Sequence, residues 1–546
     1  MYIVRKYHRQ IDQFIRSGSR AAFSVAFVLL LVVLAAMALV TFKFGAPANN
    51  GRPWDTPVIL DGAWRIVNGQ VPHRDYYNYL GDLPFFTTCL GMRLGHASAV
   101  SIDYGNLLFM AALVLPAMVV LRRRTGALPA FLFCLFVGLL VVTPKPLGDP
   151  YDYTDHAMLY NRYGEACLAL FGVLLFLPPR PGFNAGWMTW LEAVFAGFLL
   201  TALLGCKLNY FAVGIGFFGV ACITGRFGLG RAVACVMGAA AFLAAVLILT
   251  KIPPSEVLKD YRIMAACQSA GGRIRGMVVQ GAKSILLLPV LLVLAWEGFL
   301  GEAKPNGHRL RAWRELLIIT AIFGGAVMLL ATDCQQGEMP QLALAALYGS
   351  EMIQRRADEP AETLFFITAR HLGAFLLLLL FLLPPILDDL ATVRFVTFAA
   401  VKKNWESTAT LESTHLDDFR FIRGGTRSEE MREYSDRVDE GIQLLRRHPD
   451  SETLLNVLMF SDPFHVALGL MPSSGGVIGM SSDSLVKASH PSMARLLGNA
   501  THLLTDRGAG ILKEAYGAEW DALHLEIVEE TTNYSLFKIP EKPKNR

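Results

Sequence analysis

The sequence predicts a polytopic α-helical membrane domain followed by a soluble α/β domain, and three observations support this fold class. Hydrophobic residues make up 53% of the 546 residues and charged residues only 18%, whereas average soluble domains contain about 25% charged residues. The apolar residues form runs of about 15 to 22, the length that crosses the hydrocarbon core of a bilayer. Beyond residue 390 these runs end, so we expect two domains, residues 1–390 and 391–546.

Residues 1–390 contain about eleven apolar segments that we interpret as membrane spans. The first segment follows a basic stretch and is longer than the apolar core of a secretory signal peptide, which has about 7–15 residues. We therefore expect an uncleaved first helix. The predicted spans are residues 21–42, 104–121, 128–142, 163–177, 187–205, 210–224, 232–250, 285–300, 316–332, 339–352 and 371–387.

Lys and Arg gather in every second loop between these spans, as in the run Arg122-Arg123-Arg124. Because basic loops stay in the cytoplasm, we expect the N-terminus there, in a bacterial inner membrane. The complementary loops, 43–103, 143–162, 206–209, 251–284 and 333–338, then face the periplasm. Eleven crossings place residues 391–546 in the periplasm as well. If the segment 339–352 only re-enters the membrane, that domain is cytoplasmic instead.

The C-terminal domain has the pattern of a small α/β fold. Residues 428–447 combine helical periodicity with charge pairs four residues apart. Residues 454–460, 502–505, 523–528 and 534–539 have the composition of short strands. The domain contains no nucleophile motif and no phosphate-binding glycine loop. With a net charge of +4 and no recognition motif, we expect no nucleic acid partner.

The first periplasmic loop, residues 43–103, contains the most informative polar residues. Long ordered loops are usually functional, and this one offers three carboxylates for catalysis, Asp55, Asp61 and Asp75. His73 and Arg74 are candidates for binding substrate. Each carboxylate also has a structural interpretation. Asp55, for example, stands where an acid caps a helix that starts near Pro57.

The order of residues in this loop resembles that of a known family. Asp55 follows the first membrane helix, an amphipathic stretch comes next, Gly69 lies about 14 residues on, and Pro72-x-x-Asp75 completes the pattern. It resembles the first periplasmic loop of GT-C glycosyltransferases, in particular the group of the lipid A aminoarabinose transferase and the protein mannosyltransferases. That group usually has Glu after the Asp, where this chain has Thr56.

The resemblance implies a GT-C-like fold and the transfer of a sugar from a polyprenyl-phosphate carrier to a glycan, lipid or protein acceptor. Glycosyl transfer needs a carboxylate that deprotonates or orients the incoming hydroxyl. We expect Asp55 to be this base, in a single displacement that inverts the anomeric centre. The alternative is a transporter or flippase of a lipid-linked glycan, but the internal repeats usual in transporters are absent from the sequence.

The second periplasmic loop supplies further polar residues for the substrate. The candidates are Asp152, Asp155, His156, Asn161 and Tyr163. Its carboxylates are of the type that binds Mg, Mn or Ca through oxygen ligands. Since the spacing forms no dense ligand motif, a divalent cation stays an open alternative and no cofactor is assigned.

The phosphate of the donor requires fixed positive charge. Lys207 lies between two apolar runs with almost no loop around it, so it either binds phosphate or snorkels to the membrane surface. Arg162 is at a membrane edge, where charge is costly unless paired or used. The remaining basic candidates are Arg262, Arg273 and Arg275. In the fifth loop, Gln336 and Glu338 either hydrogen-bond the sugar or cap the helix that begins near Pro340.

Overall fold

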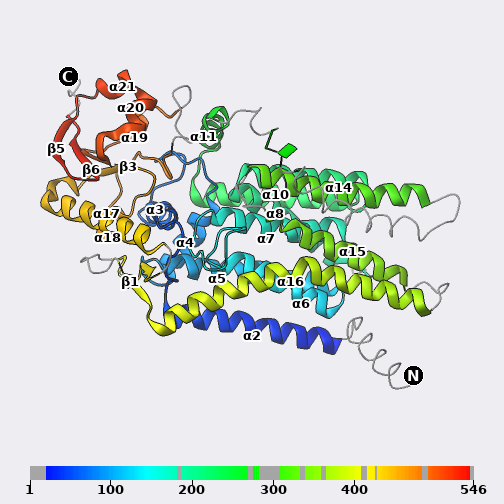
Figure 1. Ribbon diagram of the computed structural model, residues 1–546. Helices are drawn as coiled ribbons and strands as arrows, with labels where there is room; N and C mark the ends of the chain where they lie inside the picture. The colour runs from blue at the N-terminus through cyan, green and yellow to red at the C-terminus, as the bar shows by residue number, and fades with distance from the viewer. Residues whose placement is uncertain are drawn as a thin grey trace.

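The computed structural model is a long bundle of helices with a small sheet domain at one end (Figure 1). It describes residues 20–180, 186–267, 308–332, 338–357, 364–407, 415–424, 427–481 and 490–540, together with 275–276, 278–279 and 281. The predicted span 285–300 and two site candidates, Arg273 and Gln336, lie outside the described residues.

The other ten predicted spans coincide with helices, so the predicted helical membrane fold is confirmed. Six of the described helices, α2, α5, α8, α10, α14 and α16, are long and apolar enough to cross a membrane. The helices of the bundle are α2 (Arg20–Phe44), α5 (Ser101–Arg122), α6 (Ala127–Val142), α7 (Leu159–Phe176), α8 (Gly186–Cys206), α9 (Leu208–Ile223), α10 (Leu229–Thr250), α14 (His308–Thr332), α15 (Gln341–Ala357) and α16 (Leu364–Lys402).

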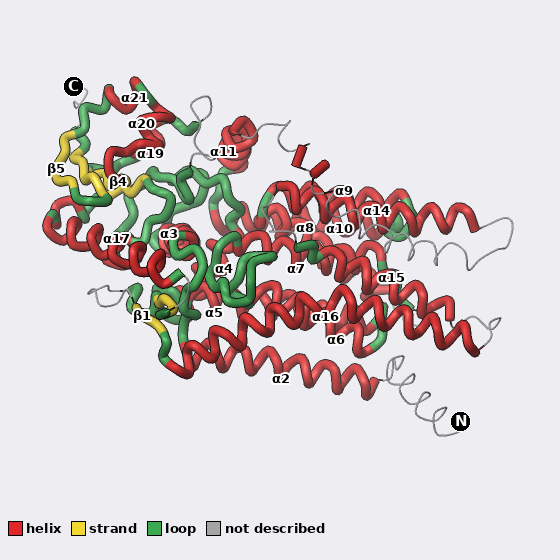
Figure 2. The backbone as a smooth tube through the Cα atoms, viewed as in Figure 1, coloured by secondary structure: helices red, strands yellow, loops and turns green. Residues whose placement is uncertain are grey.

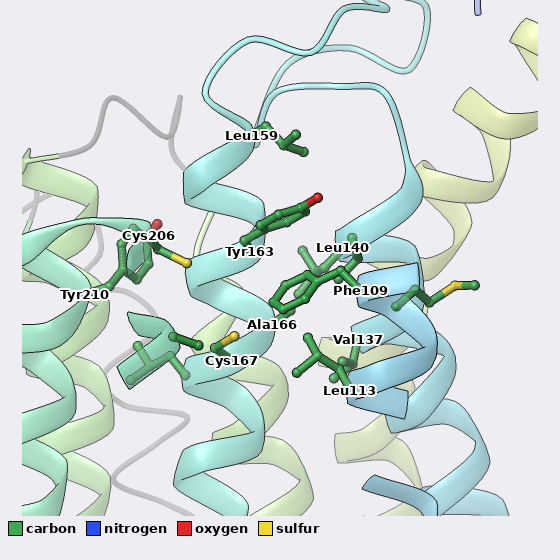
Figure 3. Close-up of a cluster of buried hydrophobic side chains, with 14 of the residues drawn as sticks. Phe109, Leu113, Val137, Leu140, Leu159, Tyr163, Ala166, Cys167, Cys206 and Tyr210 are labelled. Atoms are coloured by element: carbon green, nitrogen blue, oxygen red, sulfur yellow. The ribbon is translucent and has the colours of Figure 1, made fainter. Parts of the chain in front are cut away.

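Helix α7 is the centre of the bundle, since nearly all of its residues are buried. Figure 3 shows how Tyr163 and Cys167 of α7 lie among side chains of the neighbouring helices. The ring of Phe109 on α5 has its centroid 4.4 Å from that of Tyr163. By contrast, the outer helices expose apolar side chains such as Leu39 and Phe42 on α2, which suits contact with lipid.

Three helices outside these spans gather at one end of the bundle, α3 (Asp55–Val67) and α4 (Leu83–Leu94) from the first loop and α11 (Pro254–Cys267). We call this the loop end, and the opposite end, with Arg123 and Arg124, the arginine end. The first loop is held tightly, because a Cβ atom at Gly81 would collide with the carbonyl oxygen of Cys206. The α8–α9 junction therefore lies against the first loop.

The C-terminal domain is built on a four-stranded sheet of order β3-β4-β6-β5. Strand β3 is parallel to β4, whereas β6 is antiparallel to both of its neighbours. The predicted helix 428–447 is confirmed as α17 (Ser428–Arg447). The four strands are β3 (Leu455–Leu458), β4 (His502–Asp506), β5 (Glu526–Glu530) and β6 (Tyr534–Lys538). Strand β5 begins later than predicted because His524 has φ 49°, which an extended strand cannot accommodate.

Shorter elements complete this domain. A two-stranded antiparallel pair precedes the four-stranded sheet, and short helices follow β3 and β4 (Figure 2). These elements are β1 (Trp405–Ser407), β2 (Arg420–Ile422), α18 (Phe464–Leu468), α19 (Met493–Leu497), α20 (Gly510–Tyr516) and α21 (Ala518–Asp521).

The C-terminal domain packs directly on the first loop. The indole N–H of Trp64 donates to the carbonyl of Leu470 at 2.8 Å, and the amide of Tyr77 donates to the carbonyl of Gly476 at 3.0 Å. The structure therefore places this domain and the first loop at the same end of the bundle. Helix α15, which spans the predicted segment 339–352, is continuous.

Candidate functional site

Asp55 is the first residue of α3 and lies half-buried at the loop end. The N-cap position belongs to Trp54, and no side chain caps this helix. The Asp55 carboxylate makes no hydrogen bond or ion pair with the residues that the structure describes. Removal from water and the nearby negative charge of Asp155 raise the pKa of Asp55 to about 7. A carboxyl group with this pKa exchanges its proton near neutral pH.

Asp155 brings a second carboxylate to Asp55 from a different loop. It is buried and accepts backbone N–H groups from Arg52 at 2.6 Å and from Ala157 at 2.7 Å. Burial raises the pKa of Asp155 to about 6 even though these hydrogen bonds lower it. A Cβ at Gly51 would collide with the Asp155 carboxylate, so glycine is required for this close approach.

Positive charge lies beside this carboxylate pair. Arg52 forms an ion pair with Asp149 at 3.0 Å, and its guanidinium lies 5.0 Å from the centre of the Tyr153 ring. Arg427, from the C-terminal domain, stacks on the same ring at 3.5 Å. Sequence reasoning missed both arginines, although Arg52 stands only three positions before Asp55. Asp152, by contrast, contributes its backbone carbonyl, which accepts from the side-chain amide of Asn50 at 2.7 Å.

Asp61 is part of the contact between α3 and the C-terminal domain. Its carboxylate pairs with Arg65 at 3.0 Å, and Arg65 in turn donates to the carbonyl of Gly475 at 3.0 Å. Asp61, Asp462 and His465 could offer a metal ion three ligand atoms within 4.8 Å of one another. The imidazole of His465, however, bonds to the Asp462 carboxylate and to the carbonyl of Leu455. This cluster is buried and already paired.

Asp75 and Arg74 form a local pair at the exit of the first loop. Asp75 accepts the amide N–H of Val71 at 2.7 Å and pairs with Arg74 at 2.6 Å. These contacts close a turn, and in them both carboxylate oxygens of Asp75 are bonded to residues of the first loop.

His73 is completely buried, with φ 66°. Its Nδ1 lies 2.9 Å from Asp260 and its Nε2 lies 3.3 Å from Asp82. Burial lowers the pKa of His73, but the two carboxylates outweigh burial and raise the pKa to about 9. Asp260 also pairs with Arg495 at 2.6 Å, so this network joins the first loop, α11 and the C-terminal domain.

The predicted phosphate-binding residues have different environments. Lys207 is the N-cap of α9, and its Nζ lies 5.0 Å from the ring centre of Tyr160. Arg162 is buried in α7, where it pairs with Asp389 at 2.9 Å. It also donates to the carbonyl oxygens of residues 139, 140 and 145. Arg262 and Arg275 are exposed.

The other predicted substrate-binding residues are divided between the core and the loops. Tyr163 and Asn161 are buried, and the Tyr163 hydroxyl donates to Asn106 at 2.5 Å. His156 is buried with its Nε2 3.3 Å from Asp103. Glu338 accepts the amide N–H of Gly148 at 2.6 Å and lines an open cavity near α16.

No family model and no curated protein sequence matches the chain. Among solved structures, ArnT from Cupriavidus metallidurans in the apo state aligns with 95% of this chain and 98% of its own, at 13% identity and a TM-score of 0.43. ArnT bound to undecaprenyl phosphate aligns with 94% of this chain and 97% of its own, at 14% identity and a TM-score of 0.40.

A third match is the archaeal oligosaccharyltransferase AglB from Archaeoglobus fulgidus in complex with an inhibitory peptide and a dolichol-phosphate. It aligns with 95% of this chain and 75% of its own, at 12% identity and a TM-score of 0.33. All three alignments combine sequence identities under 15% with TM-scores under 0.5.

Proposed function

We propose that this protein transfers a hexose or pentose from a polyprenyl-phosphate carrier to a cell-envelope acceptor at the periplasmic face of the bacterial inner membrane. The observation that carries the proposal is the Asp55 carboxylate. It lies beside Asp155, has a pKa raised to about 7 and makes no bond with the described residues. This position, between the membrane helices and the C-terminal domain, is where a lipid-borne donor and a water-soluble acceptor can meet.

In the proposed reaction, Asp55 acts as the general base. The acceptor hydroxyl gives its proton to the Asp55 carboxylate, and its oxygen forms a bond to the anomeric carbon of the sugar. The bond between that carbon and the phosphate oxygen breaks, so the carrier phosphate leaves with the electron pair. One displacement of this kind inverts the anomeric centre. Asp155 keeps the proton affinity of Asp55 high, because two neighbouring carboxylates resist ionising together.

The leaving phosphate requires cations at the same end of the bundle. Arg52 is placed beside the two carboxylates, and Lys207 lies at the α8–α9 junction against the first loop. We propose that these two residues bind the donor phosphate. For Arg162 we propose a structural role in place of the predicted phosphate contact, because Asp389 and three carbonyl oxygens occupy most of its donors.

A divalent cation fits the carboxylate pair poorly. Mg²⁺ can keep several waters and bind through one or two carboxylates, but here Asp155 already accepts two N–H groups and the positive charge of Arg52 acts on both carboxylates. We therefore propose a reaction that needs no metal. Treatment of the purified protein with EDTA should leave the transfer rate unchanged, and a loss that Mg²⁺ or Mn²⁺ restores would contradict this proposal.

The direct test is Asp55→Asn in the full-length protein, reconstituted in lipid nanodiscs with a radiolabelled polyprenyl-phosphate sugar and an envelope extract as acceptor. Loss of a general base should lower the turnover by about 10²–10⁴-fold, while thermal unfolding stays unchanged. Asp417→Asn is the matched control, since Asp417 is an exposed carboxylate in the C-terminal domain. Wild-type turnover by folded Asp55→Asn would exclude Asp55 as the base. Movement of the labelled lipid across the bilayer without any sugar transfer would instead indicate a flippase.

A further inference from the structure

A pocket lies next to Asp55, between the start of α3 and the C-terminal domain. Its cavity volume is about 240 Å³. Trp54 closes one side, and the rest is formed by residues of α17, of the β3–α18 segment, of β4 and of β6. Binding pockets for drug-sized molecules usually measure about 300–1,000 Å³, so this smaller space suits a small polar ligand or a single ring of a larger one.

Aromatic side chains form much of the wall of this pocket. The rings of Trp54 and Tyr434 meet edge to face, with centroids 6.4 Å apart at 61°. The rings of Phe464 and Tyr534 also meet edge to face, with centroids 5.6 Å apart at an interplanar angle of 88°. The half-buried Phe460 lines the pocket as well. The face of an aromatic ring carries partial negative charge and therefore attracts the weakly positive C–H groups on the face of a sugar ring.

One ion pair supplies the polar groups. Arg437 and Asp506 lie 3.1 Å apart, and each side chain is 46% exposed. Together they offer charged N–H donors and carboxylate acceptors, and both kinds make stronger hydrogen bonds than neutral groups do. Neighbouring hydroxyl groups on a sugar need a donor and an acceptor side by side. The methylene groups of an acyl chain cannot form hydrogen bonds with this ion pair.

The pocket and the proposed base are positioned by the same helix. Trp54 directly precedes Asp55, and the phenol of Tyr434 is close enough to sense the Asp55 charge. On the opposite wall, Phe464 opens α18 between Asp462 and His465. Those two residues lie close to Asp61 of α3, with ligand atoms of all three within 4.8 Å of one another. A ring held in the pocket therefore contacts Trp54, the residue directly before Asp55.

From this geometry we infer that the pocket binds a sugar ring of the acceptor, so that the molecule glycosylated by this protein is itself a glycan or a glycolipid. The inference rests on the proposed function. The bound ring, or the residue linked to it, presents the hydroxyl that Asp55 deprotonates. Trp54, Tyr434 and Phe460 support the faces of the ring, and Arg437 and Asp506 bond its hydroxyl groups.

The test measures binding without any donor. Full-length protein in nanodiscs is examined by saturation-transfer difference NMR with the methyl glycosides of glucose, galactose, mannose and N-acetylglucosamine. At least one glycoside should bind to the wild type, and Phe460→Ala and Arg437→Ala should each weaken that binding roughly tenfold, a factor equal to about 1.4 kcal/mol. Arg447→Ala is the matched control, because Arg447 lies on the same helix in a similar exposed pair with Glu529. It should bind like the wild type.

Asp55→Asn separates this inference from the proposed function, since it should abolish transfer and still bind the glycoside. Absence of binding to the wild type, or equal binding by the Phe460→Ala, Arg437→Ala and Arg447→Ala variants, would overturn the inference and leave the role of Asp55 untouched. Displacement of the glycoside by a short peptide, but not by a second sugar, would also overturn it, because the pocket would then recognise a protein acceptor.

Discussion

The two ends of the helix bundle differ in how fully their carboxylates are paired. At the arginine end, Glu192 accepts from Arg123 and Arg124 at 2.7 Å, and Glu351 pairs with Arg180 and Arg355 at 2.8 and 3.0 Å. At the loop end, the Asp55 carboxylate has no partner among the described residues. The two acidic groups at the arginine end thus hold the structure together, whereas the loop end contains both paired carboxylates, such as Asp61, and the available carboxylate of Asp55.

This difference in pairing distinguishes carboxylates that are structural from those that are available for function. A buried charge that keeps its partner is a structural element, and removing one member of the pair leaves the other unpaired at high cost. A carboxylate that is taken from water without a partner instead acquires a raised pKa, which is a common property of catalytic groups. The Asp55 carboxylate at the loop end has this second property.

Glu192→Ala should produce the largest change in stability. It leaves Arg124 buried without its carboxylate, and breaking a buried pair costs about 3–5 kcal/mol. Thermal unfolding in nanodiscs should shift to lower temperature, while turnover per folded molecule is preserved. A stable Glu192→Ala protein that has lost its turnover would contradict the structural role of the arginine end, because that end would then be functional.

His73 should give the loop end a pH-dependent stability. Its pKa of about 9 in the folded state lies above the 6.5 of a histidine side chain in water, so folding favours the protonated form. The stabilisation, on the order of 3 kcal/mol, is complete below about pH 6.5 and is lost as the pH rises through 9. Hydrogen exchange in α11 and in the Arg495 segment should therefore increase between these pH values. His73→Gln should remove the dependence, and a dependence that persists in this variant would assign it to another group.

The smallest predicted effect concerns the pH profile of transfer. With Asp55 as base, the rate should rise with pH and level off above an apparent pKa near 7. Asp155→Asn removes the neighbouring negative charge, so this pKa should fall and activity below neutral pH should increase. The test is to measure the transfer rates of the wild type and the variant from pH 5 to 9 and to compare the midpoints of the two profiles. An unchanged midpoint would show that Asp155 does not set the pKa of the base.

Much of the architecture was predictable because it depends on local pattern. Apolar runs of membrane length identified the helices that the structure describes, and the charge periodicity of residues 428–447 matched α17. The partners of individual polar groups were not predictable in this way. Arg162 was expected to contact phosphate at a membrane edge, but the chain returns more than two hundred residues later to place Asp389 against it.

The candidate site likewise contains residues that the sequence could predict and residues that it could not. Its first carboxylate, Asp55, stands out in the sequence by its place after the first membrane helix. The Arg437–Asp506 pair of the pocket has no local signal, since those two residues come from different elements of the C-terminal domain.

By itself, the sequence determined that the chain crosses a membrane many times, that an α/β domain follows, and that the first loop carries the acid of interest. These properties follow from hydrophobicity and periodicity over neighbouring residues. Only the tertiary structure decided which charges are paired and which are left for chemistry. Pairing and pKa depend on side chains brought within a few ångströms from distant loops, and no local pattern encodes that distance.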